Sequence, residues 1–98
     1  MKSPDRIEIQ NALSPKHLVR VDADKYHAMK QAMLKALPSR SPGITGAALL
    51  AAIRSRLPQD LFPGGAKAGW WVKAVQLDLE AKGVVVREHV KPLRWHKR

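Results

Sequence analysis

Residues 79–87 read LEAKGVVVR, which places the end of a helical pattern, a glycine and a run of β-branched residues in direct succession. Gly83 stands where a left-handed helix C-cap is expected, and glycine adopts that conformation without a steric penalty. The valines that follow favour a strand. This stretch therefore predicts a helix that ends near Lys82 and continues at once into a C-terminal β-hairpin.

The hairpin is expected to have two different faces. Residues 84–90 and 93–98 are short runs separated by a break at Lys91 and Pro92, the pattern of two antiparallel strands. Alternate residues of a strand share a face, so Val84, Val86 and Trp95 are predicted to point to the core and Arg87 and Arg94 to project outward. Residues 82–98 hold a single acid and the densest group of cations in the chain: Lys82, Arg87, Lys91, Arg94, Lys97 and Arg98.

Two further helices are predicted before the one that ends at the glycine. Asp22 suits the N-cap of a first helix, whose apolar residues recur at helical spacing as far as Leu37. Thr45 is expected to cap a second helix that continues to about Leu57. The third helix is expected to begin near Ala66. Upstream of all three, residues 7–9 and 18–21 alternate in polarity and predict a short hairpin or two edge strands.

This order, together with Leu-Glu-x-x-Gly before β-branched residues and Arg87, resembles the junction of recognition helix and wing in bacterial winged helix-turn-helix regulators. The resemblance covers residues 22–98. It implies an α+β fold with three helices, a C-terminal β-hairpin and a short N-terminal β segment. We expect a single domain over residues 1–98, with residues 1–21 as the N-terminal β segment and residues 22–98 as the winged-helix core. One departure is the connection at residues 58–65, which is longer than the turn of a plain helix-turn-helix.

Two shorter stretches carry a second resemblance. Residues 63–71 read PGGAKAGWW and residues 92–97 read PLRWHK. Both are similar to a family of short, uncharacterised bacterial proteins, a domain of unknown function. This resemblance implies no known activity.

Composition favours an anionic partner. The 98 residues contain 18 Lys and Arg against 8 Asp and Glu, a formal net charge of +10, and polyanions are the natural partners of so basic a domain. Cysteine is absent, which excludes disulfides and thiol chemistry. An export signal and a long apolar segment are not apparent, so we expect a cytoplasmic protein without a membrane partner.

Catalytic chemistry is not indicated. The four histidines have no acid or cysteine at ligand spacing, so a metal site is not expected. Asp78 and Glu80 are predicted to point to different sides of the third helix, which leaves no general acid/base pair. We expect no enzymatic activity, no cofactor and no small-molecule ligand.

The third helix has a second apolar stripe besides its core stripe of Val72, Val75 and Leu79. Trp70 and Leu77 lie on the far side at 100° per residue, with Lys73 beside them. Three interpretations remain open: the N-terminal strands cover these residues as core, they form a homodimer or partner interface, or they contact nucleic acid.

The leading hypothesis is a winged helix that binds double-stranded DNA mainly through its phosphate backbone. Its predicted contacts are Lys67 and Lys73 on the third helix and Arg87, Lys91 and Arg94 on the wing. The alternative is a protein-interaction or homodimerisation module, with Trp70 and Leu77 as the contact surface. RNA is a third candidate partner, since single strands also suit charge combined with exposed aromatic rings.

Overall fold

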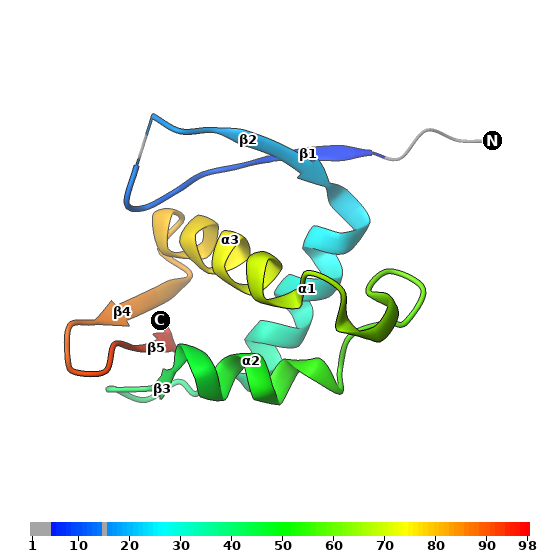
Figure 1. Ribbon diagram of the computed structural model, residues 1–98. Helices are drawn as coiled ribbons and strands as arrows, with labels where there is room; N and C mark the ends of the chain where they lie inside the picture. Colours follow the sequence, from blue (N-terminus) through cyan, green and yellow to red (C-terminus); the bar gives the residue numbers. More distant parts are fainter. Residues whose placement is uncertain (1–4, 15) are drawn as a thin grey trace.

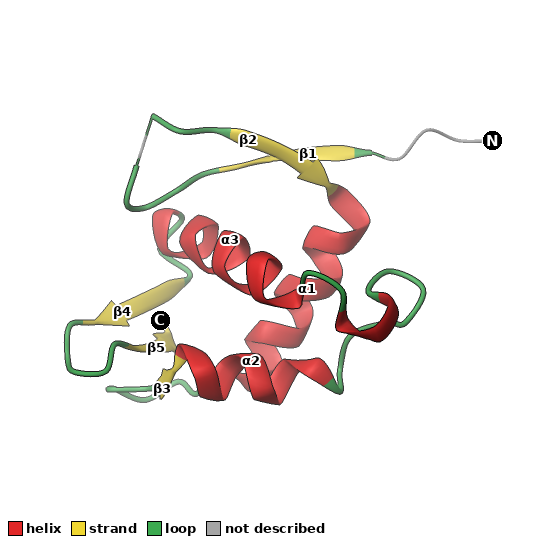
Figure 2. Ribbon diagram, in the orientation of Figure 1, coloured by secondary structure: helices red, strands yellow, loops and turns green. Residues whose placement is uncertain are grey.

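The computed structural model describes residues 5–14 and 16–98 and shows three helices, a two-stranded N-terminal sheet and a three-stranded C-terminal sheet (Figure 1, Figure 2). Residues 1–4 and 15 of the expected N-terminal β segment lie outside the described residues. The α+β class is confirmed, with three helices, a C-terminal hairpin and a short N-terminal strand pair. Among the described residues, no helix has both the length and the apolar character needed to cross a membrane.

The N-terminal hairpin pairs β1 (Arg6–Ile9) with β2 (Val19–Asp22) in antiparallel register, Ile9 opposite Val19. Its alternation of polar and apolar residues turns one face towards α3 and the other to solvent. Ile9 and Val21 on the inner face are buried. Figure 1 shows this hairpin lying across α3.

Helices α1 (Ala23–Ala36) and α2 (Gly46–Arg54) begin at the predicted caps. The Asp22 side chain accepts from the Lys25 amide at 3.0 Å, and Thr45 Oγ1 accepts from the Ala48 amide at 3.2 Å. α2 ends three residues before the predicted boundary at Leu57. Pro58 disfavours helical geometry in the residue before it, and the chain tightens into a turn there, with the Arg56 amide bonded to the Ile53 carbonyl.

The connection to α3 (Ala68–Ala81) is a folded segment, with one 3₁₀ turn, η1 (Pro63–Gly65). Phe62 from this connection is buried in the core, edge-on to Trp71. α3 starts two residues after the predicted Ala66, because Lys67 adopts a left-handed conformation with φ of 57° that a helix interior does not accept. At the other end Gly83 has the predicted left-handed conformation, with φ of 74°.

The C-terminal sheet joins β4 (Val85–Glu88) and β5 (Arg94–Lys97) to the two-residue strand β3 (Ile44–Thr45), in the order β3-β5-β4. Gly43, directly before β3, has φ of 91°, and a Cβ atom there would lie 2.0 Å from the Trp95 carbonyl oxygen. Glycine is therefore required for β3 to approach β5.

The predicted orientation of β4 is wrong. Val85 is the buried valine, while Val84 and Val86 are half-buried. Arg87 pairs directly with Trp95 across the hairpin, so both residues share the face that Val85 turns to the core. Three consecutive valines fit either phase of a strand, and the cross-strand position of Trp95 decides between them.

Candidate nucleic-acid interface

One face of the first two turns of α3 is open to solvent. Lys67, Gly69 and Lys73 are exposed, and the Trp70 side chain is 54% exposed. Lys67 occupies the N-cap position without a side-chain hydrogen bond to the helix. The free backbone amides at the start of α3 form the positive end of the helix dipole, and Lys67 lies beside them. This combination favours anions.

Trp70 is the centre of this open end. It contacts Trp71 edge-on, with ring centroids 5.2 Å apart, and Trp71 is buried where Trp70 is not. A hollow of about 470 Å³ beside the two rings is lined by Lys25 and Lys67. The exposed Trp70 ring is thus flanked by lysine side chains from α1 and from the start of α3.

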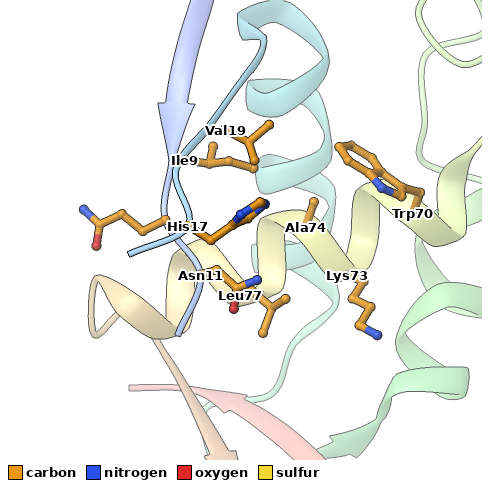
Figure 3. Close-up of a pocket in the computed structure, with 9 residues that line it drawn as sticks. Ile9, Asn11, His17, Val19, Trp70, Lys73, Ala74 and Leu77 are labelled. Atoms are coloured by element: carbon orange, nitrogen blue, oxygen red, sulfur yellow. The ribbon is translucent and has the colours of Figure 1, made fainter. Parts of the chain in front are cut away.

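The second half of α3 is closed. Residues 75–79 are all buried, which leaves no helix face free for a groove of DNA. The N-terminal hairpin covers this half: the Ala12 amide donates to the Leu77 carbonyl at 3.3 Å. Leu77 is 7% exposed and belongs to the covered part of α3, whereas Trp70 does not (Figure 3). The two residues that sequence periodicity grouped together therefore differ in solvent exposure.

The prediction that Arg87 projects outward is wrong. Its side chain is 15% exposed and forms two hydrogen bonds with the Glu80 carboxylate, the shorter at 2.7 Å. The guanidinium also lies over the Trp95 ring, 5.4 Å from the centroid. Arg87 can be buried because the Glu80 carboxylate neutralises its guanidinium and the Trp95 ring forms a cation–π contact with it.

The other two wing residues are more accessible. Lys91 is exposed in the turn between β4 and β5, and Arg94 is half-buried, with Nη1 donating to the Gly43 carbonyl at 3.0 Å. Figure 1 shows that the hairpin tip lies beyond the C-terminal end of α3. The predicted contacts therefore form two groups, one at the open start of α3 and one on the wing.

Sequence reasoning missed the buried carboxylate of Asp78. It accepts from the Tyr26 hydroxyl, from Lys82 Nζ at 2.9 Å and from the Gln10 amide at 2.8 Å. Asp78 is fully buried, so it ties α1 and α3 to the segment that directly follows β1. The one available signal was the spacing to Lys82, four residues on, which suits an ion pair on a helix.

A smaller polar cluster lies on the outer face of the wing. His96 Nε2 is 2.9 Å from Glu88 Oε1, which also accepts from the Ser41 hydroxyl at 2.8 Å, and His96 Nδ1 is 2.7 Å from the Lys97 carbonyl. The bond to that carbonyl and the bond to Glu88 raise the pKa of His96. Bonds from Ser41 and His96 lower the pKa of Glu88.

Neither polar cluster is arranged as a metal site. The described part of the chain contains no group of three or more His, Asp or Glu side chains positioned to hold a metal ion. The chemistry that the open end of α3 offers is electrostatic and aromatic contact with a ligand.

Comparison with known proteins gives one match. The model of a family of unknown function, DUF6958, matches residues 6–95, which spans all three helices and almost all of both sheets. No curated protein and no solved structure matches the chain. The match agrees with the expected resemblance to an uncharacterised family and assigns no activity. The chain therefore belongs to DUF6958, a family of unknown function.

Proposed function

We propose that this chain is a winged-helix module that binds double-stranded DNA, mainly through phosphate contacts. The order α1, β3, α2, α3, β4, β5 and the sheet order β3-β5-β4 are compatible with a winged helix. In such domains the recognition helix and the wing provide the contacts. The proposal rests above all on the open start of α3, where Lys67, Trp70 and Lys73 are exposed together.

Charge supports an anionic partner. The net charge is +10, and among the described residues only Lys82 and Arg87 of the Lys and Arg side chains form ion pairs. Cations without acidic partners gain most from a polyanion, because binding releases counterions from it. Affinity should therefore fall steeply with salt and depend little on base sequence.

The proposed contact set differs from the predicted one at one residue. Lys67 and Lys73 are proposed to hold phosphates at α3, and Lys91 and Arg94 to do so at the wing. Arg87 is left out because Glu80 already occupies its guanidinium.

The test is fluorescence anisotropy of a labelled random-sequence duplex at two salt concentrations. Replacing Lys67 and Lys73 together by Gln should weaken binding about tenfold or more at low salt and reduce the salt slope by about two units, since each phosphate contact contributes roughly one. Lys30 and Lys35 of α1 provide the matched control, because their replacement by Gln removes the same charge from another helix. An equal loss in both double variants, or no duplex binding at low salt, would overturn the proposal.

One observation favours a second candidate function, a self-association module. A groove of about 360 Å³ between α2, α3 and the wing is lined by Leu50, Trp95 and the exposed side chains of Leu13 and Leu93. Exposed apolar side chains around a groove are typical of contact surfaces. This function predicts a mass that rises with concentration in sedimentation equilibrium, and Leu93→Glu should restore the monomer. A parent protein that stays monomeric at high concentration excludes the homodimer.

A further inference from the structure

A third concave site lies between the N-terminal hairpin and α3. Its volume is about 340 Å³, within the range of pockets that hold small molecules. Ile9 and Val19 form the hairpin wall, and Ala74 and Leu77 form the α3 wall (Figure 3). The half-exposed indole of Trp70 stands at one end. The pocket is thus an apolar slot with an aromatic ring at its mouth.

The polar side chains of this pocket, His17, Asn11, Gln10 and Lys73, all carry hydrogen-bond donors. Figure 3 shows the His17 ring pointing from the hairpin towards α3, within the pocket. Asn11 Oδ1 accepts from the backbone amides of Leu13 and Ser14, so its side-chain nitrogen is the part that remains to donate. The stem of Lys73 forms part of the wall. None of the described residues that line the pocket is acidic.

The position of Lys73 matters for charge. In Figure 3 its side chain extends from α3 away from His17. Lys73 is exposed, so rotation about its four-carbon stem can bring the ammonium to the pocket mouth. The hairpin wall thus contributes an imidazole and the α3 wall a lysine to the same pocket.

We propose that this pocket binds a small aromatic carboxylate. The apolar walls and the Trp70 ring favour a planar ring, because offset and edge-on ring contacts add to the gain from burial. His17 and Lys73 favour an anionic group on that ring, and charge-assisted hydrogen bonds are stronger than neutral ones. The absence of an acid among the lining residues disfavours cationic ligands.

This site does not rest on the proposed DNA contact. Half of its wall comes from hairpin residues that the DNA proposal does not use, and its ligand is a small molecule. Its failure would leave the DNA proposal standing, and the reverse also holds.

The experiment follows amide and methyl NMR signals of the full chain during titration with benzoate, benzamide and cyclohexanecarboxylate. Benzoate should shift saturably the signals of Ile9, Val19, Ala74 and Leu77. Benzamide lacks the charge and cyclohexanecarboxylate lacks the aromatic ring, so each should bind at least fivefold more weakly. Equal affinity for benzoate and benzamide, or no saturable shift at these residues up to 10 mM, would overturn the proposal.

Matched variants make the test specific. His17→Gln and Lys73→Gln change exposed side chains, so the fold should persist, and each should weaken benzoate binding threefold or more while leaving benzamide binding unchanged. Lys16→Gln and Lys35→Gln remove cations outside the pocket and should leave benzoate binding unchanged. Ala74→Phe should fill the pocket and abolish binding, with dispersed spectra confirming that the chain is folded. Equal losses in the pocket variants and in the controls would contradict the site.

Discussion

The Tyr26 hydroxyl donates a hydrogen bond to the carboxylate of Asp78, and both side chains are buried in the contact between α1 and α3. Burial and this bond raise the pKa of Tyr26, so the phenol keeps its proton. Asp78 also accepts from Lys82 and from the Gln10 amide. A buried charge is tolerated only where such partners satisfy it, and the partners here come from three elements.

Removing the phenol hydroxyl should therefore cost stability. Tyr26→Phe removes one of the two donors to Asp78 Oδ2, which keeps Lys82 Nζ, and should lower the free energy of unfolding by about 1 kcal/mol. Asp78→Ala leaves the Tyr26 hydroxyl and the Gln10 amide without their acceptor and should cost about 2–5 kcal/mol, since each unsatisfied buried group costs about 1–3 kcal/mol. Urea denaturation measures both values. A smaller loss for Asp78→Ala than for Tyr26→Phe would contradict the central position of Asp78.

The ion pair between Arg87 and Glu80 should also stabilise the folded protein. Arg87→Gln and Glu80→Gln should each destabilise, and a double-mutant cycle should give a coupling of about 1–2 kcal/mol, because both side chains are largely buried. Arg87→Gln should leave duplex affinity within twofold of the parent protein once the chain is folded. A tenfold loss of duplex affinity would show that Arg87 is one of the residues that contact DNA.

Gly43→Ala should destabilise the C-terminal sheet. The added Cβ would collide with the Trp95 carbonyl, and alanine at this positive φ is itself strained. We expect a loss of about 2 kcal/mol or more, measured by thermal or urea unfolding. Gly69→Ala is the matched control, because open space surrounds that position in α3 and its φ is not positive.

His96 and Glu88 should make stability depend on pH. The folded-state pKa of His96 is raised above 6.5, so its contribution is complete below pH 6.5 and is lost as the pH rises through the folded pKa. The folded-state pKa of Glu88 is lowered below 4.5, so its contribution is complete above pH 4.5 and is lost as the pH falls through the folded pKa.

The pair should therefore contribute most between pH 4.5 and pH 6.5. Urea unfolding of the parent protein and of His96→Gln at pH 6 and pH 9 measures the effect. The stability difference between the two proteins should shrink at pH 9. A difference that stays constant from pH 6 to pH 9 contradicts the assignment to His96.

Local signals predicted much of the fold. Asp22 and Thr45 cap helices because their side-chain oxygens reach nearby amides, and Gly83 ends α3 because glycine accepts a positive φ. These effects act within a few residues, so the sequence alone reveals them. The phase of β4 depends on which residue pairs with Trp95, a contact distant in sequence, and it was predicted wrongly.

The candidate site was harder to predict for the same reason. Trp70 and Leu77 share a helix face, yet only the hairpin, which is distant in sequence, determines that Leu77 is covered and Trp70 is exposed. The pocket beside them is lined by hairpin and α3 residues that are distant in sequence. The sequence alone therefore did not predict this pocket. Lys67 and Lys73 were predicted from charge and helical position, and the structure places both at the surface. Their role in binding DNA stays a prediction.

The most direct test of DNA binding by the start of α3 and the wing is amide NMR mapping of the chain during titration with a random-sequence duplex at low salt. We expect the largest shifts at residues 66–74, at the start of α3, with a second group at residues 89–94 on the wing, and their reversal by added salt. Shifts confined to the outer face of α1, or no shifts at low salt, would contradict it.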